Sequence, residues 1–198
     1  MNKRVGLTGN MGSGKTLVAG IFTHLGIPVY NADERARALM SAPGPLRNAI
    51  VNLLGSESYQ GDGILDRTYI AKLVFQDTDL LQALNKLVHP AVAADSEQWD
   101  ALQSAPYTLH EAALLVQSGS SMQMRCNILV TAPELMRMDR VRQRNGWSDS
   151  EILDRLKHQW SEEQLRPHCQ YSIINDGTHS LIEQVIGIHR LILLDLGK

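Results

Sequence analysis

The sequence predicts an α/β fold built around a parallel sheet, and two observations carry that prediction. A short strand pattern at residues 4–8, with Val5 and Leu7 as its apolar residues, leads into a glycine-rich loop, a helical segment and a second short strand pattern at residues 27–30. A strand, a helix and a second strand in this order form a βαβ unit, whose strands are parallel and joined by a right-handed crossover. The uninterrupted apolar run at residues 128–130 is typical of a parallel strand buried on both faces.

The remaining elements follow from apolar spacing and from the residues that begin and end helices. Gly26 and Pro28 end the first helix, Pro90 marks a helix start, and Ser148, three residues before Glu151, matches a capping box. Strands are expected at residues 4–8, 27–30, 107–111, 127–131 and 171–174. Helices are expected at 15–25, 34–40, 46–54, 67–75, 78–88, 91–104, 133–144, 149–160 and 180–194.

The charge and the apolar pattern exclude some classes of function. The formal net charge is -2, whereas proteins that bind long nucleic acids usually carry a basic excess that neutralises phosphates. No stretch approaches the ~20 apolar residues of a membrane helix, and the N-terminal residues lack the pattern of a signal peptide. Cys126 and Cys169 are far apart and predict reduced thiols. We expect a cytoplasmic protein that binds neither nucleic acid nor a membrane.

The loop at residues 9–16 satisfies the full Walker A pattern, with a strand before it and a helix after it. Its glycines allow backbone N–H groups to surround phosphate oxygens, and the following helix adds the positive end of its dipole. Lys15 is expected to reach the β- and γ-phosphates, and Thr16 to give its hydroxyl to Mg²⁺. The sequence thus predicts a site for a purine nucleoside triphosphate. Its expected residues are Asn10, Met11, Gly12, Ser13, Gly14, Lys15, Thr16 and Leu17.

A carboxylate, Asp33, follows the second predicted strand. Ligands of parallel α/β sheets bind at the carboxyl ends of the strands, so this side chain is expected near the phosphate loop. A carboxylate there can accept the proton of a substrate hydroxyl that attacks the γ-phosphate. The alternative is an N-cap, in which Asn31 or Asp33 binds free N–H groups of the next helix. Position alone supports both roles equally, and one residue can fill both.

Further motifs extend over nearly the whole chain. They are Leu25-Gly26-Ile27-Pro28-Val29, Asn31-Ala32-Asp33 followed by Ala36-Arg37, Leu84-Asn85 followed by His89-Pro90, Leu114-Leu115 followed by Ser118-Gly119, Arg140 with Arg144, Gln159, and Ile174-Asn175. Together with the phosphate loop, these motifs resemble the dephospho-CoA kinase family. That family transfers the γ-phosphate of ATP to the ribose 3′-hydroxyl of dephospho-CoA, the last step of coenzyme A synthesis.

The resemblance implies a three-layer P-loop NTPase fold with a parallel five-stranded sheet, a helical insert and a small helical lid. Residues 1–33, 105–133 and 167–198 are expected to form the nucleotide-binding core, and residues 34–104 to hold dephospho-CoA. Residues 134–166 read as polar helices around a turn and are expected to close as a lid that keeps water from the γ-phosphate. ATP and Mg²⁺ are the implied cofactors, and dephospho-CoA is the implied partner of a monomer or weak homo-oligomer.

The resemblance also implies roles for single residues on the nucleotide side. Asp33 would be the general base for the ribose hydroxyl, in a catalytic set with Lys15 and Arg140. Arg140 and Arg144 lie four positions apart and share one helix face, which suits phosphate oxygens. Without the resemblance, a solvated basic helix face that also holds Arg137 and Arg142 explains this pair. Asn175, in a late turn, would belong to the nucleotide site.

On the substrate side, Arg37 and His89 are the candidate residues. Arg37 is suited to a substrate phosphate but equally to an exposed position, and His89 to a structural or a substrate-contacting role. The chain departs from the family pattern at Gln117, where the family commonly has Glu, at Glu111, where it often has Asp, and at Gln170, where it usually has Asp. These departures leave the core chemistry in place.

Two other functions compete with this one. Another P-loop nucleoside or nucleotide kinase would share the phosphate loop but use a different acceptor. A nucleotide-dependent switch usually needs an Asp-x-x-Gly segment after a strand to sense the γ-phosphate. Asp176-Gly177 lacks that spacing, which disfavours the switch.

Overall fold

The computed structural model describes residues 3–197, and its internal contacts divide the chain into two compact units. The first unit consists of Met1–Asn31 and Gln103–Lys198, and the second of Ala32–Leu102. The outermost residues of the predicted nucleotide-binding core, 1–2 and 198, lie outside the described residues.

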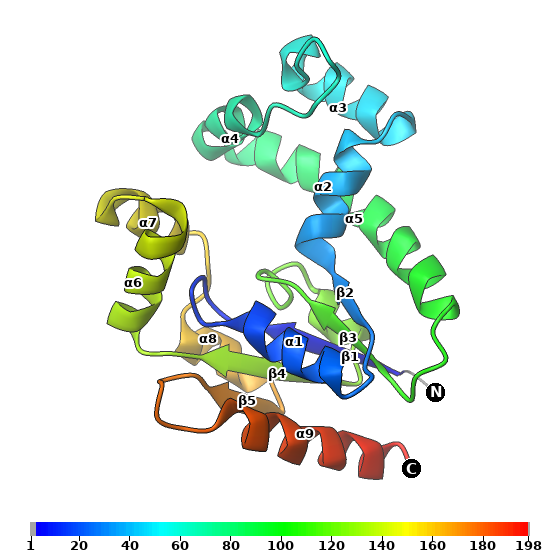
Figure 1. The fold of residues 1–198 in the computed structure, drawn as a ribbon. Helices are drawn as coiled ribbons and strands as arrows, with labels where there is room; N and C mark the ends of the chain where they lie inside the picture. The colour runs from blue at the N-terminus through cyan, green and yellow to red at the C-terminus, as the bar shows by residue number, and fades with distance from the viewer. Residues whose placement is uncertain (1–2, 198) are drawn as a thin grey trace. The chain divides into compact units, whose positions relative to one another are not determined.

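The first unit contains a five-stranded parallel sheet (Figure 1). Its strands are β1 (Arg4–Thr8), β2 (Val29–Asn31), β3 (Thr108–Glu111), β4 (Cys126–Thr131) and β5 (Tyr171–Ile174). They lie in the order β2-β3-β1-β4-β5, and every neighbouring pair is parallel. The predicted α/β fold with five parallel strands is confirmed. Because β1 lies between β3 and β4, the carboxyl ends of all three strands meet where the phosphate loop begins.

Helices cover both faces of this sheet. On one face, α1 (Lys15–His24) and α9 (Leu181–Asp195) pack on a cluster that includes the fully buried Ile128 and the almost fully buried Val130 of β4 (Figure 1). Leu129, between them, points to the other face and packs against Val116 and Leu165. This split follows from the period of two in a strand, and each such buried side chain contributes about 1.5–3 kcal/mol. The continuous apolar run of β4 therefore contributes buried side chains to both faces of the sheet.

Between β4 and β5 the chain forms a series of short helices: α6 (Glu134–Asn145), α7 (Asp149–Leu156), α8 (Glu162–Leu165) and the 3-10 turn η3 (Arg166–His168). The capping box of Ser148 and Glu151 begins α7 as predicted. The predicted helix at 149–160 is too long, because the backbone N–H groups of His158 and Gln159 bond carbonyls three residues back instead of four. The backbone N–H of Trp160 then bonds the side chain of Gln117. Ser161 then begins α8 with a second capping box.

The second unit is helical, with α2 (Ala32–Ser41), α3 (Pro45–Leu54), η1 (Ser56–Ser58), α4 (Arg67–Gln76) and α5 (Thr78–Ala101). The prediction of two helices, 78–88 and 91–104, is wrong: α5 is continuous, with Pro90 inside it. An interior proline removes one backbone hydrogen bond and costs about 3 kcal/mol. Packing of α5 against α2, α3 and α4, with Leu84 and Val88 buried, offsets that cost. In the part of the chain that is described, no helix is long and apolar enough to cross a membrane.

Candidate active site

The phosphate loop connects β1 to α1, and its shape depends on glycine. Gly12 and Gly14 have positive φ angles of 80° and 96°. A Cβ atom on Gly12 would lie 2.4 Å from the backbone oxygen of Arg137, and one on Gly14 would lie 2.1 Å from the side-chain nitrogen of Asn175. Gly14 also precedes α1, which has no side-chain cap and no acidic residue in its first turn. The positive end of this helix is thus suited to an anion.

Two predicted residues from distant parts of the chain bind the backbone of this loop. Asn175, after β5, is buried, and its side-chain nitrogen donates to the carbonyl of Ser13 across 2.8 Å. Arg140 of α6 donates to the carbonyl of Gly12 at 3.3 Å, and to the backbone and side-chain oxygens of Asn175 at 3.2 Å each. The loop is therefore bordered by a guanidinium group that α6 supplies.

The other arginines of α6 do not form one solvated basic face. Arg144 is exposed and donates to the side chain of Asn145. Arg142 forms ion pairs with Asp139 and Asp149, and Arg137 donates to the carbonyl of Ala132. Each guanidinium therefore has a different environment, and Arg140 is the member of the predicted pair that contacts the phosphate loop.

Lys15 and Leu17 lie in the first turn of α1. The Lys15 ammonium group donates to the carbonyls of Gly9 at 2.8 Å and Asn10 at 3.4 Å. It is thus held on the loop that is predicted to surround the phosphates. Leu17 is 58% exposed, so its side chain contributes little to the core.

Thr16 contacts the carboxylate of Glu111, a position where the chain departs from the family pattern. Its hydroxyl donates to Glu111, with 3.1 Å between Oγ1 and Oε1. Glu111 ends β3, is 6% exposed and lies in register with Leu7 of β1. A hydroxyl and a carboxylate oxygen are the kind of hard ligands that Mg²⁺ prefers, so this pair fits the predicted metal. The sequence shows that an acidic residue ends this strand. It does not show that β3 is the neighbour of β1, because the order of strands in the sheet decides that.

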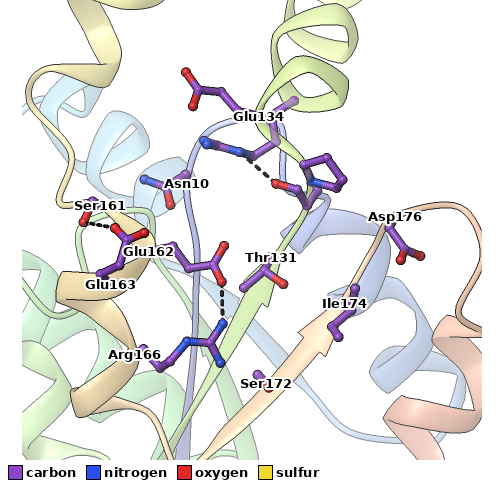
Figure 2. Close-up of a pocket in the computed structure, with 13 residues that line it drawn as sticks. Asn10, Thr131, Glu134, Ser161, Glu162, Glu163, Arg166, Ser172, Ile174 and Asp176 are labelled. Atoms are coloured by element: carbon purple, nitrogen blue, oxygen red, sulfur yellow. Dashed lines mark hydrogen bonds and ion pairs between the residues drawn. The ribbon is translucent and has the colours of Figure 1, made fainter.

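A cavity of about 460 Å³ opens beside the phosphate loop (Figure 2). It is bounded by the ends of β4 and β5, the start of α6 and helix α8, and Asn10 is its contact with the loop. Glu162 pairs with Arg166 along one wall, and Ser161 donates to Glu163 (Figure 2). The lining is mostly polar and charged, and it does not include the Lys15, Thr16 and Glu111 group.

Asp176 also lines this cavity. Backbone N–H groups of His179 and Thr178, followed by the Thr178 hydroxyl, hold the pKa of the Asp176 carboxyl well below its usual range. The carboxylate is therefore charged at neutral pH and fixes the turn between β5 and α9.

The remaining predicted site residues belong to the second unit. Asp33 and Arg37 lie on α2, His89 lies within α5, and all three are exposed. Because α2 begins at Ala32, Asp33 lies in its first turn, where a negative charge interacts favourably with the helix dipole. Asp33 therefore lies inside the helix and not at its N-cap position, which precedes Ala32, and a charge in the first turn is compatible with a catalytic role.

Comparison with known proteins decides the family. A family model described as dephospho-CoA kinase matches residues 3–180. The chain belongs to the dephospho-CoA kinase family. A dephospho-CoA kinase of Porphyromonas gingivalis is 36% identical over 93% of this chain and 91% of its own length. One from Salinibacter ruber is also 36% identical, over 88% of this chain and 89% of its own.

Solved structures share the fold of this chain. A crystal structure from Thermus thermophilus matches with a TM-score of 0.85 and 32% identity, over 97% of this chain and 98% of that chain. The dephospho-CoA kinase of Campylobacter jejuni matches with a TM-score of 0.68 and 20% identity over the same shares. Shikimate kinase from Acinetobacter baumannii, at 0.54 and 17% over 98% and 95%, shares the fold alone. The resemblance seen in the sequence is thus confirmed at the level of family and fold.

Proposed function

We propose that this chain uses ATP to phosphorylate the ribose 3′-hydroxyl of dephospho-CoA, giving coenzyme A and ADP. The observation that carries the proposal is the grouping of Lys15, Thr16 and Glu111 at the carboxyl ends of β1 and β3, in a chain of this family. A cation, a hydroxyl and a carboxylate beside a glycine loop are the parts that phosphoryl transfer needs.

In the reaction, the 3′-oxygen of the ribose attacks the γ-phosphorus. The bond from that phosphorus to the β–γ bridging oxygen breaks, and ADP leaves with the electron pair. The hydroxyl proton passes to Asp33, which acts as general base. Support for this role comes from chain position: β2 ends at Asn31, which lies in register with Glu111, and Asp33 follows two residues later.

On the nucleotide side, hydrogen bonds to loop carbonyls already hold the positive charges of Lys15 and Arg140 beside the phosphate loop. Lys15 exchanges the loop carbonyls for β- and γ-phosphate oxygens, and Arg140 provides a second cation beside Gly12. Thr16 and Glu111 would hold Mg²⁺, which supplies neutralisation of the charge that builds up on the phosphate oxygens. Asn175 keeps the loop in shape through its bond to the Ser13 carbonyl.

The acceptor side rests on the second unit. Residues 34–104 hold dephospho-CoA in this proposal, with Arg37 and His89 as its contacts. Residues 134–166 close as a lid, and Arg144, four residues after Arg140, reaches the nucleotide on closure. The exposure of Arg37, His89 and Arg144 is consistent with groups that acquire partners on binding.

The test is product formation by the purified chain with ATP, Mg²⁺ and dephospho-CoA. Mass spectrometry should detect coenzyme A and ADP in equal amounts. A panel of nucleosides, nucleotides and shikimate in place of dephospho-CoA tests the alternative of another small-molecule kinase. If the chain binds ATP but forms no coenzyme A, or turns over another acceptor faster, the proposal is wrong.

We also propose that the chain acts in the cytoplasm as a monomer or weak homo-oligomer. Cys126 and Cys169 are free thiols, as expected in a reducing compartment. Light scattering over a range of concentrations tests the oligomeric state. A stable oligomer that persists on dilution would contradict it.

A further inference from the structure

A short segment after α7, residues 158–160, runs past the phosphate loop, and we call it the return segment. Two of its groups bind the loop. The Gln159 side-chain oxygen accepts the backbone N–H of Met11 at 2.9 Å, and the Trp160 carbonyl accepts the Asn10 side-chain amide at 2.8 Å. The return segment thus fixes two successive residues of the loop.

Gln117 in turn holds the return segment. Its side-chain nitrogen donates to the carbonyl of His158 across 2.9 Å, and its side-chain oxygen accepts the backbone N–H of Trp160 across 3.2 Å. The neighbouring residue, Val116, is buried in the same apolar cluster against which Trp160 packs. Packing and two hydrogen bonds therefore set the position of the return segment along residues 116–117.

The chemistry of these partners requires an amide at position 117. A carbonyl oxygen can only accept and a backbone N–H can only donate, so one side chain must offer both a donor and an acceptor. A carboxylate at this position would keep the bond to Trp160 but place negative charge against the carbonyl of His158. Gln117, which stands where the family commonly has Glu, thus supplies both the donor for the carbonyl of His158 and the acceptor for the N–H of Trp160.

We propose that Gln117 is a positioning residue for ATP: by holding the return segment, it fixes Asn10 and Met11 in the conformation that binds the phosphates. It acts through other residues and touches neither substrate nor reacting atoms. The inference deepens the proposed function and rests on it, since it concerns the same phosphate loop. ATP binding therefore depends on an amide that lies outside the loop.

The experiment measures the ATP affinity of Gln117→Leu and Gln117→Glu by calorimetry, without acceptor. Both variants should weaken ATP binding about tenfold, because Gln117→Leu loses both hydrogen bonds to the return segment and Gln117→Glu loses the bond to the carbonyl of His158. In steady-state assays, KM for ATP should rise while kcat and KM for dephospho-CoA change little. The matched controls are Gln123→Leu and Gln123→Glu, on an exposed glutamine of the same unit. They should leave ATP affinity unchanged.

A second substitution separates positioning from general destabilisation. Gln159→Leu removes only the acceptor of the Met11 N–H, and it should also weaken ATP. Both glutamines act through the return segment. The fold loss of ATP affinity in the double variant Gln117→Leu/Gln159→Leu should therefore be smaller than the product of the two single fold losses. Unchanged ATP affinity in the Gln117 variants, or fully multiplicative losses, would overturn the inference. ATP binding is measured without an acceptor. A finding that dephospho-CoA is not the acceptor would therefore contradict the proposed function but not the role of Gln117.

Discussion

The hydroxyl of Thr16 donates a hydrogen bond to the carboxylate of Glu111, and this bond joins the first turn of α1 to the end of β3. Glu111 is nearly fully buried, and its carboxyl oxygen lies 3.1 Å from the hydroxyl that the Walker A pattern assigns to Mg²⁺. The oxygen pair therefore links the phosphate loop to the neighbouring strand, and it makes Glu111 a candidate for metal binding.

Replacement of Glu111 by Gln keeps the shape of the side chain and removes its charge. We expect Mg²⁺ affinity or turnover to fall about 10–100-fold, the usual effect of changing a group that supports a metal site. Initial rates over a range of free Mg²⁺ measure it. Glu183→Gln, on an exposed carboxylate of α9, is the control. A Glu111→Gln variant with the Mg²⁺ dependence of the unaltered protein would remove Glu111 from the site.

The general base is tested by Asp33→Asn, which retains the polar side chain but cannot accept the ribose proton. We expect kcat to drop about 100-fold, the typical size of a general-base effect, with ATP affinity nearly intact. The neighbouring exposed carboxylate offers a matched control, Glu34→Gln, which should keep most of the activity. Asp33 has no catalytic role if the two variants have the same kcat.

The two predicted lid arginines should differ in their effect on ATP. Arg140→Leu removes bonds to Gly12 and Asn175, and charged hydrogen bonds contribute about 1.5–3 kcal/mol each. We expect kcat/KM for ATP to fall about 10–100-fold, which is the kinetic equivalent of that range. Arg144→Leu should have a smaller effect, because its guanidinium bonds the adjacent Asn145. Equal losses in both variants would argue that the lid arginines act together.

Features whose partners lie close in the sequence were predictable. The capping box of Ser148 and Glu151 forms as its spacing indicates, and Asp77 caps α5 by accepting the backbone N–H of Leu80. The phosphate loop lies between a strand and a helix for the same reason. In the two caps the favourable geometry is complete within one turn of chain, so tertiary packing has little to change.

Features that depend on distant partners were not predictable from spacing. Thr16 and Glu111 are 95 residues apart, and only the strand order brings β3 beside β1. Gln117 and Trp160 are 43 residues apart, so the hydrogen bond between them could not be predicted from spacing either. Pro90 led to a wrong prediction of two helices. Proline usually interrupts a helix, but packing along α5 outweighs this local preference. Local rules therefore located the loop, and the tertiary fold supplied its neighbours.

A hydrogen-bonded pair in the first unit, formed by the buried Tyr107 and the half-buried His189, predicts how stability responds to acid. The Tyr107 hydroxyl and the Nδ1 atom of His189 form a hydrogen bond of 2.7 Å, and Tyr107 is fully buried. Burial, and to a lesser extent the charge of Arg190, lower the pKa of His189 below its ordinary value of 6.5. The folded protein thus favours the neutral ring, and the unfolded chain binds the proton more readily.

The free energy of unfolding should therefore decrease as the pH falls below about 6.5 toward the lowered pKa of His189. Urea unfolding from about pH 8 to about pH 5 measures this dependence, with His189→Gln as a variant that does not titrate. The stability difference between the unaltered protein and the variant should shrink on acidification. Asp176 does not interfere, because its lowered pKa confines its own effect to pH values below the ordinary 3.8. A difference that stays constant over this range would show that His189 has the same pKa in both states.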